Sequence, residues 1–204
     1  MLIVCILAMN GCESSNVKED TVNATEEIVD WSEYYQSILA SNTSEAVNQI
    51  ITGDFEGNGN TQAFIITTPQ PLDLNESSLI DDFFCVSSLW YLNGEVCQNV
   101  YLDENRYSVI CESGYIQGKM VIAIGTLTAW APEQNYDSTV WYVSDGVPKN
   151  AGEMVCVYAI EDGYLLTCEK SYGEDEEGIY RALFEYAKFS FDNGTISFVE
   201  SYIE

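Results

Sequence analysis

The chain reads Ser88-Leu89-Trp90-Tyr91-Leu92-Asn93-Gly94, and about fifty residues later the pattern returns as Thr139-Val140-Trp141-Tyr142-Val143-Ser144-Asp145-Gly146. A weaker copy, Phe189-Ser190-Phe191-Asp192-Asn193-Gly194, follows after a similar interval. Each copy is a run of aromatic and aliphatic residues that ends in Asn-Gly or Asp-Gly, which is typical of a strand entering a hairpin turn. The sequence therefore predicts an antiparallel unit that repeats about every fifty residues.

A second marker recurs with the same period, because residues 112–115 read Glu-Ser-Gly-Tyr and residues 161–164 read Glu-Asp-Gly-Tyr. With a further turn signal at Asp162-Gly163, the pattern predicts about eleven strands in three units that begin near residues 62, 106 and 154. Units of this size form propeller blades, but closed propellers generally use four to eight of them. Three units therefore predict either an incomplete ring or a sandwich of consecutive meanders.

Helical patterns precede the β region. Apolar residues recur at helical spacing behind the capping residues Asn23 and Glu26, which predicts a helix over 26–40: Ile28, Trp31, Tyr35, Ile38 and Leu39. Asn42 and Glu45 repeat the capping pattern, which predicts a second short helix that ends near Gly53. The expected fold is mainly β, with antiparallel four-stranded meander units, propeller-blade-like or sandwiched, after one or two N-terminal helices. We expect residues 26–204 to form a single domain.

The composition excludes several functions. The 204 residues include 33 acidic and 7 basic side chains and no histidine, for a formal net charge of −26. Such a charge disfavours binding to nucleic acid or to anionic membrane surfaces. Without histidine, a Ser-His-Asp triad, a Cys-His pair and an imidazole metal ligand are all excluded.

The N-terminus predicts where the protein resides. Residues 2–8 form a short apolar run, and Cys12 follows three residues after Met9. This arrangement resembles the signal peptide of a bacterial lipoprotein, although no basic residue precedes the run and Met9 stands where leucine is usual. The resemblance implies a signal segment over 1–11, lipidation of Cys12, a tether over 12–25 and an extracytoplasmic protein that touches the membrane only through its lipid. The alternative is a buried N-terminal strand.

An acidic, glycine-rich loop is the candidate metal site. Oxygen-bearing side chains alternate along it, at Asp54, Glu56, Asn58, Asn60 and Gln62. Alternate side chains of a tight loop can converge on one cation, and calcium takes six to eight oxygen ligands. The loop is not an EF-hand, because Ile65 occupies the position of the bidentate glutamate. The alternative is a turn whose Asn and Asp side chains bond their own backbone.

The region from Trp31 through Tyr34 and Tyr35 to the loop Gly53-Asp54-Phe55-Glu56-Gly57-Asn58-Gly59 resembles surface lipoproteins of Gram-positive anaerobes. Their loops resemble those of FG-GAP and VCBS-type repeats, which use them for calcium. The resemblance implies calcium ligands at Asp54, Glu56, Asn58 and Asn60. Gln62 stands where those proteins often have an acid, which removes one charge from the site.

Two pairs of cysteines are candidates for disulfides. Cys156 and Cys168 are symmetric about a turn at residue 162, and Cys97 and Cys111 are symmetric about residue 104. A three-residue hairpin at each place would bring each pair face to face, whereas a two-residue turn would shift the register and separate them. The alternative is buried free thiols.

For function, we expect a binding module. Four Trp and fourteen Tyr on a β scaffold offer stacking surfaces for a carbohydrate or anchors for a protein partner, and Trp130, in a loop beside Ala131 and Pro132, is the candidate ligand aromatic.

The alternative is a histidine-independent hydrolase, such as a glycosidase that uses a pair of carboxylates. Candidate carboxylates for it are Asp81, Asp82, Glu161 and Asp162. The acidic run 174–177 predicts a solvated loop, with a secondary cation site as the alternative.

Overall fold

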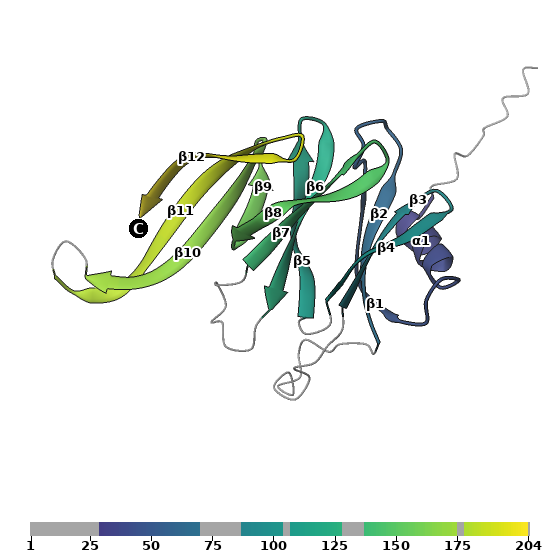
Figure 1. Cartoon of the computed structure of the whole chain (residues 1–204), viewed down its shortest axis with the longest axis horizontal. Helices are drawn as coiled ribbons and strands as arrows, with labels where there is room; N and C mark the ends of the chain where they lie inside the picture. Colours follow the sequence, from purple (N-terminus) through teal and green to yellow (C-terminus); the bar gives the residue numbers. More distant parts are fainter. Residues whose placement is uncertain (1–28, 70–86, 104–106, 128–136, 175–177, 204) are drawn as a thin grey trace, which may run out of the picture.

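The residues that the structure describes form three four-stranded antiparallel sheets (Figure 1). A computed structural model describes residues 29–69, 87–103, 107–127, 137–174 and 178–203. These residues contain one helix, α1 (Trp31–Leu39), and sheet A with β1 (Ala46–Gly53), β2 (Gln62–Thr68), β3 (Ser87–Asn93) and β4 (Val96–Asp103). Sheet B contains β5 (Tyr107–Ile116), β6 (Lys119–Leu127), β7 (Asp137–Ser144) and β8 (Val147–Val155). Sheet C contains β9 (Val157–Glu161), β10 (Tyr164–Glu174), β11 (Tyr180–Asp192) and β12 (Thr195–Ile203). The strands follow chain order in every sheet, so the prediction of a mainly β fold of four-stranded meanders is confirmed.

Sheet B lies between the other two sheets, which stand at opposite ends of the stack (Figure 1). Phe64 and Tyr91 of sheet A pack against Ile122 and Trp141 of sheet B in one core. A second core joins the opposite face of sheet B to sheet C through Val121, Val140, Val157, Ile160 and Leu165. Strand β5 contacts both β1 and β9, so the first strands of the three sheets lie near one another, as the inner strands of propeller blades do.

The aromatic repeat marks the same place in each sheet. It occupies the third strand, namely β3, β7 and the end of β11, together with the turn that follows. The second marker is not equivalent in this way. Residues 112–115 lie inside β5, whereas residues 161–164 span the turn between β9 and β10, so the similarity between these two stretches was misleading.

Most of the expected turns form where the sequence predicts them. Asp145-Gly146, Asp162-Gly163 and Asn193-Gly194 each have positive φ at both residues, as the favoured two-residue hairpin turn requires. The turn between β3 and β4 is displaced by one residue, because Asn93 pairs with Val96 and leaves Gly94 and Glu95 at the centre.

The second predicted helix is wrong, because residues 46–53 form strand β1. Ile50 packs toward α1 and Ile51 packs into the core between sheets A and B, so consecutive residues serve opposite faces. This two-residue period belongs to a strand, and pairing with β2 overrides the local capping pattern. The described residues therefore hold twelve strands rather than about eleven, and the first unit begins at Ala46 rather than near residue 62.

Helix α1 covers the face of sheet A that points away from sheet B (Figure 1). It begins at Trp31 rather than at residue 26, because the Asp30 side chain accepts hydrogen bonds from the backbone N–H groups of Ser32 and Glu33 at 3.0 and 3.2 Å. Tyr35 and Leu39 are buried against Ala63. Among the described residues, no helix has the length and apolar character that crossing a membrane requires.

Candidate functional site

The acidic loop connects β1 to β2, and its oxygen atoms bind the loop's own N–H groups. Asp54 Oδ1 accepts from the amides of Gly57 and Asn58 at 2.7 and 3.0 Å, and Oδ2 accepts from Gly59 at 2.7 Å. The Asn58 side chain accepts from the Asn60 amide at 2.9 Å and donates to Glu56 Oε2 at 2.6 Å. This is the self-bonded turn that the sequence offered as the alternative to a calcium site.

The electrostatics of the loop follow from these contacts. Burial acts to raise the pKa of Asp54, but backbone N–H donors from Gly59, Asn58, Gly57 and Glu56 outweigh it and lower that pKa. Gln62 differs from the other candidate ligands because its side chain is fully buried and its Oε1 accepts from the Phe55 amide at 2.8 Å. Gln62 therefore braces the base of the loop. Within the described ranges, no group of three or more Asp, Glu or Cys side chains is placed to hold a metal ion.

The loop also joins sheet A to sheet B. Phe55 is fully buried in the core between the two sheets, with its ring 4.9 Å from that of Phe64. The carbonyl oxygen of Asp54 accepts a hydrogen bond from the Met120 amide at 2.9 Å, at the start of β6. In the described geometry, the loop therefore holds sheets A and B together.

A row of tyrosines lies on the face of sheet C that points away from sheet B. Ala187 and Phe189 of β11 line the side toward sheet B, so Tyr186 projects to the other side. The Tyr186 ring lies 5.9 Å from the ring of Tyr158 on β9 and 5.2 Å from that of Tyr202 on β12, and is nearly parallel to the latter at 17°. We call Tyr158, Tyr186 and Tyr202 the tyrosine row. Tyr158 is 39% exposed and Tyr202 is 56% exposed, so the row is accessible to a ligand.

Two lysines flank the tyrosine row on the same face. The Lys188 ammonium group lies 4.0 Å from the centre of the Tyr164 ring and 3.7 Å from Glu200 Oε1. The Lys170 ammonium group lies 5.5 Å from the centre of the Tyr172 ring. These cation–π contacts hold both ammonium groups close to the aromatic surface.

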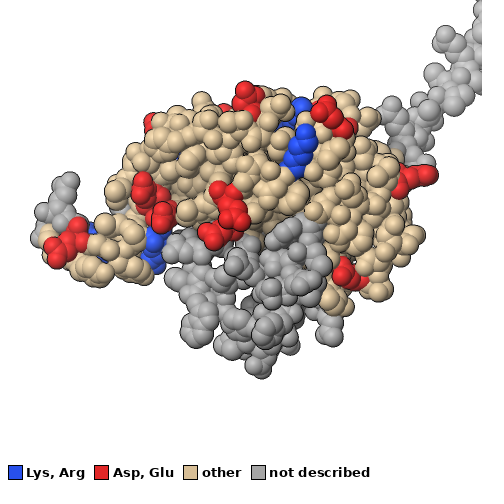
Figure 2. All heavy atoms as spheres, viewed as in Figure 1, with Lys and Arg blue, Asp and Glu red and all other residues tan. Residues whose placement is uncertain are grey.

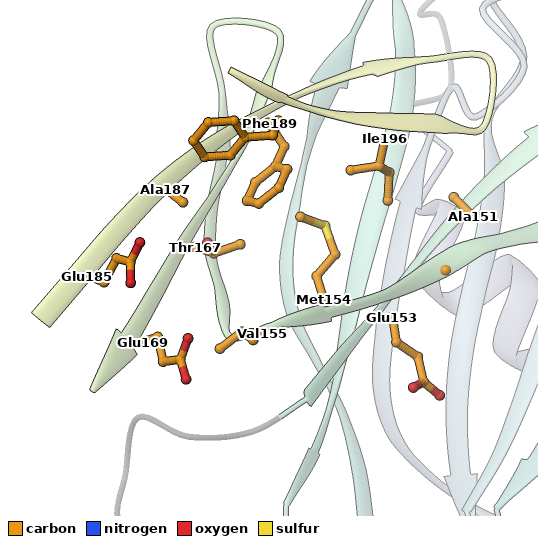
Figure 3. Close-up of a pocket in the computed structure, with 12 residues that line it drawn as sticks. Ala151, Glu153, Met154, Val155, Thr167, Glu169, Glu185, Ala187, Phe189 and Ile196 are labelled. Carbon is orange, nitrogen blue, oxygen red and sulfur yellow. The ribbon is translucent and has the colours of Figure 1, made fainter. Parts of the chain in front are cut away.

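A cleft of about 550 Å³ opens on the opposite side of sheet C, between that sheet and β8 (Figure 3). Met154, Phe189 and Ile196 supply apolar walls, and the carboxyl groups of Glu169 and Glu185 stand together on neighbouring strands. These two glutamates are directly opposed in the register of β10 and β11, where like charges repel. Both are exposed, which moderates their repulsion.

The carboxylates considered for catalysis lie elsewhere. Glu161, the last residue of β9, and Asp162, in the turn that follows, are both exposed, whereas Asp81 and Asp82 lie outside the described residues. Glu161 has an acidic neighbour on β5, Glu112. Burial raises the pKa of Glu112, and the nearby charge of Glu161 raises it further.

The cysteine predictions have different outcomes. The hairpin that would bring Cys97 and Cys111 face to face is not formed, because β4 and β5 belong to different sheets. The side chain of Cys111 lies outside the described part of the chain. Cys97 packs beneath α1, where burial raises its pKa. Cys156 and Cys168 are brought together, since the Cys168 amide donates to the Cys156 carbonyl oxygen at 3.1 Å. Both side chains are buried.

Several predicted sites lie outside the described residues: Cys12 with the signal segment and tether, Trp130, and residues 175–177 of the acidic run. Acidic side chains are scattered over the visible face of the molecule rather than gathered in one patch (Figure 2). The charge pattern therefore does not single out a binding site on that face.

The tyrosine row and the cleft were missed by sequence reasoning. Both depend on which residues of β9, β10, β11 and β12 stand opposite one another. That register includes β-bulges, which the sequence pattern does not predict. The outward position of Tyr186, between the inward-facing Glu185 and Ala187, was the one available signal. No family model matches the chain, and no curated protein matches it either.

Proposed function

We propose that this protein is an extracytoplasmic, lipid-anchored binding module, and that the tyrosine row on sheet C is its carbohydrate-binding surface. The observation that carries the proposal is the contiguous run of three tyrosine rings across β9, β11 and β12 on an exposed sheet face. Tyrosine combines an apolar ring with a polar hydroxyl, which suits the alternating apolar faces and hydroxyl edges of sugars.

The neighbouring lysines support the same ligand class. Lys170 and Lys188 are held beside the aromatic rings, where their N–H groups are within reach of a ligand that stacks on the tyrosines. A sugar hydroxyl accepts hydrogen bonds, and an acidic sugar gains a charge-assisted one. A carbohydrate therefore uses both kinds of side chain on this face.

The test is a binding assay with soluble neutral and acidic polysaccharides, read by calorimetric titration. We expect Tyr186→Ala to weaken binding roughly tenfold, which corresponds to about 1.4 kcal/mol. Tyr202→Ala on the edge strand should act in the same direction, with less risk to packing. Tyr115→Ala is the control, because Tyr115 is 54% exposed, close to the 56% of Tyr202, but belongs to β5 of sheet B. Equal losses in Tyr186→Ala and Tyr115→Ala, or no binding to any polysaccharide, would reject the tyrosine row as a carbohydrate site.

The lipid anchor is proposed from residues 2–12. Cys12 follows a short apolar run, in the position where bacterial lipoproteins are acylated. We expect the full precursor to incorporate radiolabelled palmitate in a bacterial host and Cys12→Ser to abolish the label. Label that persists in Cys12→Ser would place the lipid elsewhere, and Cys5→Ser serves as the control.

Calcium at the acidic loop is the further part of the proposal. Asp54 and Glu56 supply the charges, but a cation must compete with the N–H groups of Gly57, Asn58 and Gly59 for the Asp54 oxygens. We therefore expect weak affinity, with Kd on the order of 10⁻³ M, as in extracellular modules. Calorimetric titration should give heat for the native chain and for Asp162→Asn, and none for Asp54→Asn. No heat and no rise in Tm at millimolar calcium would remove the ion from the proposal.

A carboxylate-pair hydrolase is the second candidate. The opposed Glu169 and Glu185 in the cleft favour it, since opposed Cβ atoms lie about 4.5–5.5 Å apart and glycosidase carboxyls about 5–9.5 Å. It ranks second because a general acid needs shielding from water, and both glutamates are exposed. Release of sugar from a polysaccharide by the native chain but not by Glu185→Gln would reverse this order.

A further inference from the structure

Cys156 and Cys168 are opposed because of a register shift in β9. The turn at Asp162-Gly163 has two residues, since Glu161 pairs with Tyr164. A regular ladder from this turn would place Cys156 opposite Glu169 and leave Cys168 beside it. The ladder is not regular, because Leu166 pairs with Ala159 but Thr167 pairs with Val157. Tyr158 is thus the extra residue of a β-bulge, and the bulge moves Cys156 opposite Cys168.

The backbone contact confirms this register. The Cys168 amide donates to the Cys156 carbonyl oxygen at 3.1 Å, as in a hydrogen-bonded antiparallel pair. Such a pair has Cα atoms about 5.5 Å apart, within the usual span of about 4.4–6.8 Å for disulfides. Opposed residues also project to the same face of the sheet, and both side chains are buried, at 4% and 8% exposure.

The pair extends the tyrosine row into the sheet. Cys168 is opposed to Tyr186 on β11, and Tyr186 is opposed to Tyr202 on β12. Cys156, Cys168, Tyr186 and Tyr202 therefore lie in one line across sheet C. A covalent bond at the start of this line would fix β9, which carries Tyr158, to β10.

We propose that Cys156 and Cys168 form an intramolecular disulfide that staples β9 to β10 beside the tyrosine row. One thiolate attacks the disulfide of an oxidant, which releases one thiol of the oxidant and leaves a mixed disulfide. The second cysteine then attacks its partner's sulfur and releases the other oxidant thiol. Two electrons pass to the oxidant, and the two cysteine protons end on its two released thiols. An extracytoplasmic location supplies such disulfide oxidants, but the geometry of the pair does not depend on the proposed ligand.

The experiment uses the full chain equilibrated with an excess of oxidised glutathione. The chain is then denatured, alkylated and digested without reductant, and the peptides are identified by mass spectrometry. We expect a cross-linked peptide pair that joins Cys156 to Cys168. Full alkylation of both cysteines, or their capture mainly as glutathione adducts or as partners of other cysteines, would overturn the proposal.

The melting temperature distinguishes the effect of the Cys156–Cys168 disulfide from a general effect of oxidation. The oxidised chain should melt roughly 5–10 °C above the reduced chain, because the bond restricts the unfolded state. The shift should persist in Cys97→Ser, whose thiol lies under α1, and vanish in Cys156→Ser and Cys168→Ser. A shift that survives in the last two variants would assign it to other cysteines. If those variants fail to fold, the peptide map of the native chain still decides the question.

Discussion

Asp54 is the residue that organises the loop connecting β1 to β2, which also contacts sheet B. Its two carboxylate oxygens accept three backbone hydrogen bonds, while its carbonyl oxygen accepts from Met120 across the interface. The side chain therefore fixes the loop in the shape that delivers Phe55 into the core. A single carboxylate links local turn geometry to the packing of two sheets.

The pH dependence of stability should report this role. The folded-state pKa of Asp54 is lowered from the ordinary value of 3.8, so the unfolded chain takes up the proton first as pH falls. The stabilisation is complete above that ordinary value and is lost as pH falls through the lower folded-state pKa. We expect Asp54→Asn to lower the urea midpoint at neutral pH, and its deficit relative to the native chain to shrink as the pH falls below the ordinary value of 3.8.

Asp162→Asn is the control for this pH series. It removes a carboxylate from the exposed turn between β9 and β10, where Asn also tolerates the positive φ of 50°. The measurement is made in chelator, so that calcium binding does not contribute. A deficit in Asp54→Asn that stays constant down to the acid end of the series would show that the charge of Asp54 is not what holds the loop.

Among the elements, β5 and β9 approach one another closely across the interface between sheets B and C. A Cβ atom built on Gly114 would lie 2.1 Å from the Ile160 carbonyl oxygen and 2.9 Å from the Ile160 Cβ atom. Only a residue without a side chain allows this contact. The glycine that seemed to mark a repeat in the sequence is therefore a packing requirement of the interface between sheets B and C.

Gly114→Ala should destabilise the fold by about 2 kcal/mol, because backbone atoms of β9 must move to make room. The urea midpoint of unfolding measures this loss. Gly173→Ala is the matched control, since its new methyl group would meet only the movable end of the Leu183 side chain at 3.0 Å. The same substitution there should be neutral or slightly stabilising. Similar losses at both positions would show that the close approach of β5 and β9 is not the cause.

The sequence was a good guide to elements whose signals are local. The hairpin turns at 145–146, 162–163 and 193–194 follow from the chemistry of Asp, Asn and Gly alone. Strand β1 was predicted as a helix because Asn42 and Glu45 resemble a cap, and only pairing with β2 makes residues 46–53 a strand. A two-residue turn alone would place Cys156 and Cys168 out of register, and the bulge at Tyr158 restores the pairing. Their alignment therefore depends on a feature that turn chemistry does not predict.

For the whole molecule, the number and type of units were predictable and the sites were not. The fifty-residue repeat predicted three meanders, because each unit carries its own aromatic third strand. The tyrosine row draws its members from three strands of sheet C, and the cleft draws its walls from sheets B and C. Both sites depend on the register between strands and on how the sheets stack, and neither can be predicted from the spacing of residues within one strand.

The two ends of the stack differ in what covers them. Helix α1 packs on the outer face of sheet A through Tyr35 and Leu39. The outer face of sheet C presents Tyr158 and Tyr202 to solvent. The proposed binding surface therefore occupies the end of the stack that lies away from α1 (Figure 1).

The chain order of the strands has a consequence for folding. Every strand in sheets A, B and C pairs only with its neighbours in the sequence, so each sheet can close its hydrogen bonds as soon as its own segment is free to fold. Sheet A can then offer its apolar face to sheet B, and sheet B can offer its second face to sheet C. We expect vectorial folding from the N-terminus, in which each finished layer is the template for the next.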